Sequence, residues 1–141
     1  MAIERSLILV KPDAVVKGNI TAILNRFESQ GLKLVACRML KMDEKLARIH
    51  YEAHVDKPFF PGLLTYITSA PIVAAIFEGE DAVARCRAIM GPTNPANAPE
   101  GTIRKDFGEN IERNAVHGSD SVESAKREIS IYFTPDVIQE Y

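Results

Sequence analysis

The fold is set by one apolar run and the residues that end it, Leu7-Ile8-Leu9-Val10-Lys11-Pro12-Asp13. Four consecutive apolar residues are typical of a strand buried on both faces at the centre of a sheet. Pro12 cannot donate a ladder hydrogen bond, and it keeps the residue before it extended. The run therefore predicts a central strand with Lys11 held at its C-terminal end.

Helices and further strands follow this run in alternation. Apolar residues spaced i, i+3, i+4, i+7 predict a helix with Asn19 as N-cap and Gly31 at its end. The remaining chain predicts, in order, a strand over residues 32–40, a helix from Asp43, a short helix over 63–69, a strand over 71–77, a helix from Glu80, a short strand through Val116 and a final helix. The stripes expected to face the core are Leu46, Ile49 and Ala53 in the helix from Asp43, and Val122, Ala125, Ile129 and Tyr132 in the final helix.

Without its insertions, the order of elements is βαββαβ. This order predicts an α+β, ferredoxin-like fold in which helices pack on one face of a four-stranded antiparallel sheet. The chain is also expected to have a long loop and a C-terminal helix outside this arrangement. The loop, residues 91–113, has three prolines, three glycines and one expected helical turn at 102–108. So long an irregular segment inside a compact domain is usually either functional or disordered. The 141 residues fit a single domain spanning 1–141.

Composition excludes several classes of function. The formal net charge is −2, so no global basic field predicts nucleic-acid or membrane-surface binding. The first residues have too short an apolar run for a signal peptide, and no stretch is long enough for a membrane span. The two cysteines suit neither a disulfide framework nor a zinc cluster. We therefore expect a cytoplasmic protein.

The segment most suggestive of chemistry is Asn114-Ala115-Val116-His117-Gly118-Ser119-Asp120. His117 follows a short apolar pair, and Gly118 frees the backbone to turn. Ser119, Asp120 and Ser121 offer side-chain oxygens to the first N–H groups of the following helix. We expect His117 at a strand end beside a helix N-terminus, where backbone dipoles favour anions.

Familiar phosphate-binding and nucleophile motifs are missing from the sequence. It contains no P-loop, no Rossmann glycine motif and no protein-kinase motif set. The serine-hydrolase elbow is also missing, because Gly118-Ser119-Asp120 lacks the second glycine. Ser119 therefore fits a capping or positioning hydroxyl. Any bound phosphate has to be held by side chains.

Three cations stand where site residues tend to gather. Lys11 ends the central strand, Arg87 lies near the end of a helix, and Arg104 lies in the long loop with Thr93. Each alone fits an ordinary surface charge, but strand ends and long loops are common places for functional residues. Phe59 lies between two prolines and fits an exposed aromatic platform as well as a core position.

His50 and His54 lie four residues apart and could in principle share a metal ion. The intervening residues do not form H-E-x-x-H, and the P-C-x-x-C segment of zinc deaminases is absent. We therefore expect two exposed histidines on a helix and no metal site there.

The segment 114–120 resembles N-x-x-H-G-S-D, the active-site signature of the nucleoside diphosphate kinase family. Further agreement is found at Lys11-Pro12-Asp13, His50-Tyr51, Lys57-Pro58-Phe59-Phe60, Thr93-Asn94-Pro95, Gly101-Thr102-Ile103-Arg104 and Ser119-Asp120-Ser121-Val122-Glu123-Ser124-Ala125. These motifs cover nearly the whole chain in the family's order, and the length is similar to that of compact bacterial members. Pro92 and Ala14 depart from residues common in the family.

The resemblance implies transfer of the terminal phosphate of a nucleoside triphosphate to a nucleoside diphosphate. The mechanism would be ping-pong, through a phosphohistidine on His117. An unperturbed histidine has a pKa of about 6.5 and is largely neutral at pH 7, which leaves a ring nitrogen available as nucleophile. The resemblance also implies six nucleotide-binding residues, Lys11, Phe59, Arg87, Thr93, Arg104 and Asn114, and three supporting residues, Tyr51, Ser119 and Glu128.

Within that set, Phe59 would stack on the base opposite Ile111, and Asn114 and Lys11 would also contact the ribose. Stacking tolerates every base, so we expect broad use of bases and sugars. Either Glu128 or Ser119 would orient the second nitrogen of His117. Mg²⁺ would arrive on the nucleotide phosphates, since no dedicated carboxylate cage is evident. The family forms homo-oligomers of four or six chains, and the brief C-terminal tail favours four.

Two other functions remain open at this stage. A regulatory module that binds nucleotide without turnover would use the same cations and Phe59 but no nucleophile. A scaffold subunit for other partners would need neither, and this role can coexist with catalysis.

Overall fold

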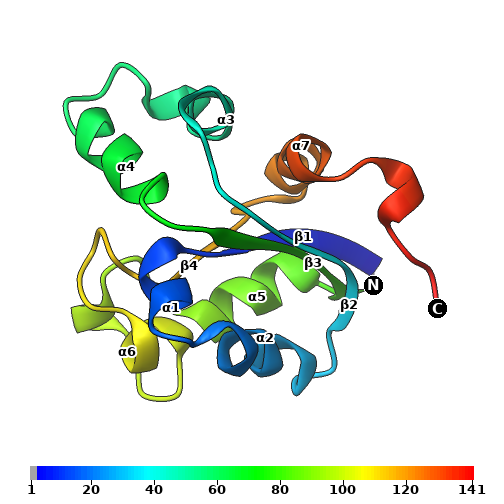
Figure 1. Ribbon diagram of the computed structural model, residues 1–141. Coiled ribbons are helices and arrows are strands. Elements are labelled where there is room, and N and C mark those ends of the chain that lie inside the picture. Colours follow the sequence, from blue (N-terminus) through cyan, green and yellow to red (C-terminus); the bar gives the residue numbers. More distant parts are fainter. Residues whose placement is uncertain (1–2) are drawn as a thin grey trace.

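The computed structural model describes residues 3–141 and contains one four-stranded antiparallel sheet (Figure 1). The strands are β1 (Ile3–Val10), β2 (Lys33–Leu40), β3 (Ile72–Glu80) and β4 (Val116–Gly118), arranged in the order β2-β3-β1-β4. β1 pairs with β3 along its whole length and with β4 at its C-terminal end, where Leu9 lies opposite His117. The predicted central strand and the ferredoxin-like α+β fold are confirmed.

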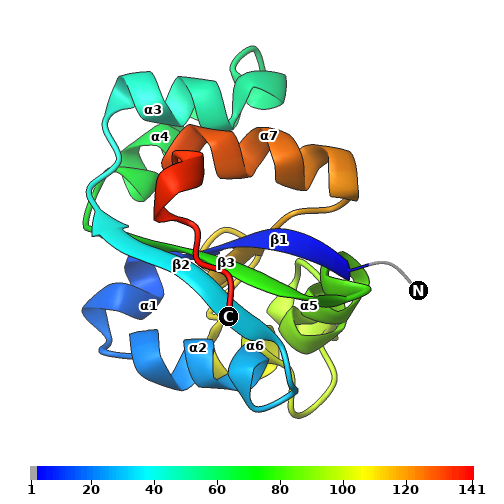
Figure 2. The same ribbon diagram turned by 90° about the vertical axis from the view of Figure 1, so that its right-hand side faces the viewer.

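Helices cover both faces of the sheet (Figures 1 and 2). On one side lie α1 (Pro12–Val16), α2 (Ile20–Glu28), α5 (Ala82–Met90) and α6 (Ile103–Phe107). On the other lie α3 (Glu44–His50), α4 (Phe60–Ile67) and α7 (Val122–Tyr132). Three short 3-10 turns complete the described chain, at Glu52–His54, Pro95–Asn97 and Pro135–Val137. The expectation of helices on one face therefore holds for α2 and α5 but not for α3, α4 and α7.

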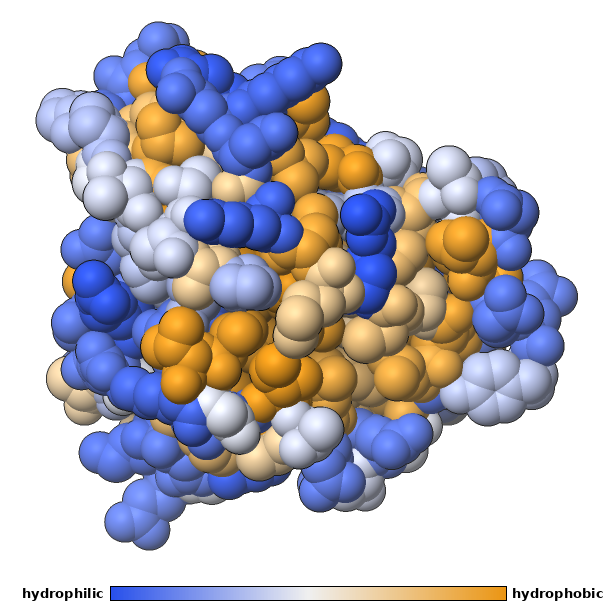
Figure 3. Space-filling model, in the orientation of Figure 1, coloured by the Kyte–Doolittle hydropathy of each residue, from blue (hydrophilic) through white to orange (hydrophobic). Residues whose placement is uncertain are grey.

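The side chains of β1 explain why both faces are covered. Ile8 and Val10 pack in the core beneath α2 and α5, whereas Leu7 and Leu9 pack in the core beneath α4 and α7. All four are fully buried. Burying such a side chain contributes about 1.5–3 kcal/mol, so neither face could be left open to water. In the orientation of Figure 1, apolar side chains gather across the middle of the visible face and polar ones surround them (Figure 3).

Two of the predicted apolar stripes were partly wrong. In α3 the buried residues are Ala47 and His50, while Ile49 is 43% exposed and Ala53 lies in the following 3-10 turn. Asp43 caps α3 as expected, but the helix ends after two turns, so the stripe cannot continue to Ala53.

In α7, Ala125 and Tyr132 are buried as predicted, but Val122 is exposed at the first turn. Glu128 is buried on the same helix, a position that an apolar stripe does not reveal. Helix α1 was not predicted. Pro12 stands in its first turn, where a missing N–H costs nothing.

Gly118 has a different role from the predicted turn. It is the last residue of β4, and a Cβ at this position would press against the flexible Sδ and Cε end of the Met90 side chain. Glycine lets β4 approach α5 closely, and a larger residue would require Met90 to shift.

Arg26 of α2 anchors the long loop over residues 91–113. Its guanidinium donates hydrogen bonds to the Gly101 carbonyl at 3.0 Å and to the Asp106 carboxylate at 2.8 Å. Thr102 caps α6 by accepting from the N–H of Lys105. The loop is therefore ordered and carries Arg104 toward the sheet. Within residues 3–141, none of the helices has both the length and the apolar character to span a bilayer.

Candidate active site

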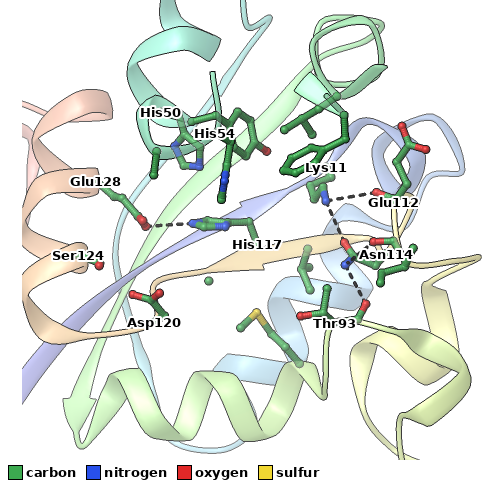
Figure 4. Close-up of a pocket in the computed structure, with 18 of the residues that line it drawn as sticks. Lys11, His50, His54, Thr93, Glu112, Asn114, His117, Asp120, Ser124 and Glu128 are labelled. Carbon is green, nitrogen blue, oxygen red and sulfur yellow. Dashed lines mark hydrogen bonds and ion pairs between the residues drawn. The ribbon is translucent and has the colours of Figure 1, made fainter. Parts of the chain in front are cut away.

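A cavity of about 1310 Å³ brings the predicted site residues together. All of them except Ser119 line it: Lys11, Tyr51, Phe59, Arg87, Thr93, Arg104, Asn114, His117 and Glu128. They come from the end of β1, the segment after α3, the start of α4, α5, the long loop, β4 and α7. Side chains distant in the sequence thus face one space (Figure 4). A cavity of this size can hold a ligand as large as a nucleotide.

His117 is held by a chain of hydrogen bonds that begins on the backbone of β1. Its Nε2 lies 3.0 Å from Oε1 of Glu128 (Figure 4). Ser119 Oγ donates to the same carboxylate oxygen at 2.8 Å and accepts from the N–H of Leu7 at 3.2 Å. Glu128 therefore contacts the imidazole directly, and Ser119 acts through Glu128.

This arrangement selects the nitrogen that can react. When the proton is on Nε2 and points at the carboxylate, the Nδ1 lone pair is free. Within residues 3–141 no hydrogen bond engages Nδ1, and the His117 side chain is 24% exposed. Burial acts to raise the pKa of the Glu128 carboxyl, but the hydrogen bonds from His117 and Ser119 outweigh burial and lower it. Glu128 is therefore ionised at neutral pH and can accept both donors.

His50 was expected on the surface, and that expectation is wrong. It is 7% exposed, its ring stands edge-on to the His117 ring at 4.7 Å, and its Nδ1 lies 2.9 Å from the Tyr132 hydroxyl. Burial, followed by the charge of His117, lowers the pKa of His50 to about 3. A neutral imidazole thus packs against His117. The i, i+3 spacing of Ala47 and His50 was the only sequence signal for this position.

His54, in contrast, is exposed as expected. It lies in the 3-10 turn rather than on α3, with its ring 5.6 Å from that of Phe59. In the described part of the chain, no three histidine, cysteine or acidic side chains cluster closely enough to hold a metal ion.

Lys11 and Asn114 form the opposite side of the cavity (Figure 4). Lys11 Nζ donates to Oδ1 of Asn114 at 2.9 Å and to the Glu112 carbonyl at 3.4 Å. The Asn114 amide in turn donates to the carbonyls of Thr93 at 2.9 Å and Ile111 at 3.2 Å. Burial, opposed by the charge of Asp13, lowers the pKa of Lys11 to about 8, so its amine remains mostly protonated at pH 7.

Arg104 is fixed by two backbone carbonyls. Its Nη1 donates to Gly91 and its Nη2 to Val116, both at 2.9 Å. Burial, and then the charge of Arg87, lowers its pKa to about 10. Its buried Nε has no hydrogen-bond partner among the residues described. No acidic side chain in residues 3–141 forms an ion pair with Arg104 or Arg87.

These three cations make the cavity a site for a multiply charged anion. Lys11 and Arg104 lie in surroundings that penalise their charge, and Arg87 is exposed beside them. A polyphosphate would supply opposite charge to the two arginines, which form no ion pair within residues 3–141. A histidine with one free nitrogen lies in the same cavity.

Phe59 and Ile111 form an exposed apolar pair on the cavity wall. They are 55% and 61% exposed, whereas the neighbouring Phe60 is buried in the core. Of the two positions considered for Phe59, the structure has the exposed platform.

Tyr51 lies in the wall with the edge of its ring against His50 at 4.6 Å. Among the hydrogen bonds of the described chain, none joins Tyr51 to Lys11. The aromatic neighbour of Lys11 is instead Tyr66, a residue that the sequence did not single out.

Comparisons with known proteins agree with this geometry. A family model described as nucleoside diphosphate kinase matches residues 4–138. The nucleoside diphosphate kinase of Dehalococcoides mccartyi is 55% identical over 98% of this chain and 97% of that protein. A crystal structure of the Aquifex aeolicus nucleoside diphosphate kinase matches with a TM-score of 0.95 at 42% identity, over 98% of this chain and all of the other. The Halobacterium salinarum enzyme in complex with CDP also matches with a TM-score of 0.95 at 42% identity, over 99% and 93% of the two chains.

Proposed function

This chain belongs to the nucleoside diphosphate kinase family, a family of enzymes of nucleotide phosphate transfer, and on that premise we propose that it works through a phosphohistidine on His117. The observation that carries this proposal is the imidazole whose Nε2 is held by Glu128 while its Nδ1 shares a cavity with three cations. The terminal phosphate of a nucleoside triphosphate would pass to the histidine and then to a nucleoside diphosphate.

The two halves of the reaction balance without any outside proton. The Nδ1 lone pair attacks the γ-phosphorus, an N–P bond forms, and the bond to the β–γ bridging oxygen breaks, so that the diphosphate leaves with the electron pair. The proton stays on Nε2 throughout, hydrogen-bonded to Glu128. A terminal oxygen of a second diphosphate then attacks the same phosphorus, and cleavage of the N–P bond restores the imidazole. One site thus serves donor and acceptor in turn, which gives ping-pong kinetics.

We propose that the cations hold the phosphates and the exposed apolar pair holds the base. Lys11 and Arg104 would stabilise the charge on the transferring group, and Arg87 and Thr93 would bind the phosphates. Asn114 and Lys11 would contact the ribose.

The base would stack on Phe59 with Ile111 opposite, which predicts broad tolerance of bases and sugars. The kcat/KM values across purine and pyrimidine, ribo and deoxyribo nucleotides test this, and a strong preference for one base would contradict it. A bound nucleotide is consistent with the CDP complex of the similar Halobacterium salinarum enzyme.

Mg²⁺ fits this site as an ion carried by the nucleotide. Mg²⁺ bound to a polyphosphate keeps several waters and needs only one or two protein carboxylates. Asp120, an exposed carboxylate on the cavity wall, would hold it. When bound, the ion would neutralise phosphate charge.

We propose in addition that the protein is a homo-oligomer of four or six chains in the cytoplasm. The two free cysteines suit a reducing compartment. Analytical ultracentrifugation measures the number of chains.

The decisive experiment is incubation with γ-labelled ATP. The wild-type protein should give an acid-labile, alkali-stable phosphoprotein whose label passes to added diphosphate, and His117→Ala should give none. His54→Ala is the matched control, because it removes an exposed histidine of the same cavity and should leave labelling intact. A wild-type protein that binds nucleotide without becoming labelled would instead be a binding module, and a fully active His117→Ala would end the proposal.

A further inference from the structure

Tyr66 of α4 connects that helix to the C-terminal end of the central strand, β1. It lies two turns into α4, whose N-cap is Phe59, and it is 4% exposed. Its ring lies 5.4 Å from Lys11 Nζ and 5.4 Å from the guanidinium carbon of Arg113. Both distances are within the range of cation–π attraction. Its hydroxyl donates a hydrogen bond to Oδ1 of Asp13.

Asp13 links Tyr66 to Ala115, the residue that precedes β4, the strand of His117. Its carboxylate is 3% exposed, and its other oxygen, Oδ2, accepts from the N–H of Ala115 at 3.1 Å. Ala115 has φ +73°, a left-handed conformation that a residue with a Cβ adopts only under constraint. The Ala115 carbonyl also accepts from the backbone N–H of Lys11 at 2.8 Å. Asp13 therefore holds a strained junction in place.

The junction lies between two groups that the reaction needs. Asn114, on one side of Ala115, directs its side chain to the Lys11 ammonium and to the loop. On the other side, β4 begins at Val116 and continues to His117. A shift of Ala115 would therefore move Asn114 first, because β4 is also held by its pairing with β1.

We propose that Tyr66 is a positioning residue. Its hydroxyl acts through Asp13 and Ala115 to fix the position of the Asn114 amide relative to Phe59, where the base would stack. The inference rests on the proposed function, since it assumes that Asn114 meets the ribose. Tyr66 itself does not line the cavity and need not touch substrate. The proposal gives α4 two tasks, one at its exposed N-terminus and one at its buried face.

Tyr66→Phe isolates the hydroxyl, because phenylalanine keeps the ring that packs against Lys11. The variant leaves Asp13 Oδ1 without its donor in a buried position, so that the carboxylate keeps its hydrogen bond to the N–H of Ala115 but loses the one that fixes its orientation. The experiment measures single-turnover phosphorylation of His117 by ATP and by 2′,3′-dideoxy-ATP, each relative to wild type with the same donor. We expect kcat/KM to fall about tenfold with ATP and no more than about twofold with the dideoxy donor, which lacks the hydroxyls that Asn114 would contact.

The matched control is Tyr141→Phe, which removes a tyrosine hydroxyl bonded to the Leu34 carbonyl near the C-terminus. It should leave both donors unchanged. Asp13→Asn tests the intermediate step independently and should reproduce the selectivity for ATP. The double variant Tyr66→Phe/Asp13→Asn should lose no more kcat/KM with ATP than the more affected single variant does, because both changes interrupt one chain of contacts.

Equal losses with both donors would overturn the proposal, since they would mean that Tyr66 only stabilises the fold. Undiminished ATP kinetics in Tyr66→Phe would overturn it as well. Failure of the proposed function looks different: wild-type protein would form no phosphohistidine with either donor, and this is seen before any variant is made.

Discussion

The floor and the rim of the cavity are built in opposite ways. The floor, defined as Lys11, Asn114, His117 and Glu128, is largely buried and joined by hydrogen bonds to the loop and, through Ser119 behind it, to the backbone of β1. The rim, defined as Phe59, Arg87, Thr93 and Ile111, is exposed. Groups that act on a reacting phosphorus gain from being held before substrate arrives. Under the proposed function, exposed groups that meet the outer phosphates and a variable base gain from freedom to adapt, so the two regions would suit chemistry and binding respectively.

The two arginines test this contrast most strongly. Arg104 is fixed by hydrogen bonds to two backbone carbonyls, whereas the Arg87 side chain is exposed and makes no hydrogen bond within residues 3–141. We expect Arg104→Ala to lower kcat by roughly 10²–10³-fold, the scale for one positioned transition-state donor. Arg87→Ala should act mainly on KM. Steady-state kinetics with ATP and a diphosphate acceptor measure both, and Arg48→Ala, a change at an exposed helix position, is the control. Equal kcat losses in the two site variants would remove the distinction.

Glu128→Gln weakens the floor without changing its shape. Glutamine can still accept a hydrogen bond from Nε2 of His117, but it lacks the charge that receives donors from both His117 and Ser119. We expect kcat to fall about 10- to 100-fold, the cost of a misaligned reacting group. Glu123→Gln on the exposed side of the same helix should have no effect. A Glu128→Gln enzyme with wild-type kcat would show that the carboxylate is not needed.

The pH dependence of kcat/KM probes the charge of Lys11. Its pKa of about 8 lies below the ordinary value of 10.5, so the free enzyme carries the ammonium below pH 8 and loses it above. Because kcat/KM reports groups of the free enzyme, it should fall as pH rises through about 8, by up to about tenfold per pH unit. Arginine stays protonated, so Lys11→Arg should lack this alkaline limb, each profile being compared with its own maximum. An identical limb in the variant would assign the titration to another group.

Phe59→Ala should have the smallest effect, and it should fall on binding. Losing one base–aromatic stack corresponds to about 1–3 kcal/mol. Because Phe59 is 55% exposed, we expect the lower end of this range, a rise in KM of about fivefold with little change in kcat. Val16→Ala, also exposed but outside the cavity, serves as control. If kcat fell as sharply as it does for Arg104→Ala, the rim would share the task of the floor, and the contrast between the regions would fail.

The sequence correctly predicted the elements that depend on short-range patterns. The unbroken run from Leu7 to Val10 predicted a strand buried on both faces, and Pro12 predicted an extended Lys11, which has ψ 164°. The position of the long loop followed from its prolines and glycines. These features succeed because local sterics and hydrophobic spacing act between residues close in the chain.

Two of the features that the sequence did not reveal depend on partners far away in the chain. His50 is buried because Tyr132, 82 residues later, supplies a hydrogen-bond partner. Met90 packs against Gly118, and nothing in the local sequence indicates that contact.

The sequence by itself determined the central strand and the order of elements, and it supplied the residues that we propose to hold and receive a phosphate. Only the tertiary structure decided that Glu128 rather than Ser119 contacts the imidazole, that two backbone carbonyls fix Arg104 but no hydrogen bond within residues 3–141 fixes the Arg87 side chain, and that the Tyr66 hydroxyl meets Asp13. The physical reason is that hydrogen bonding and burial depend on which atoms meet in space. Residue types specify what a side chain can do, and packing specifies which partner it finds.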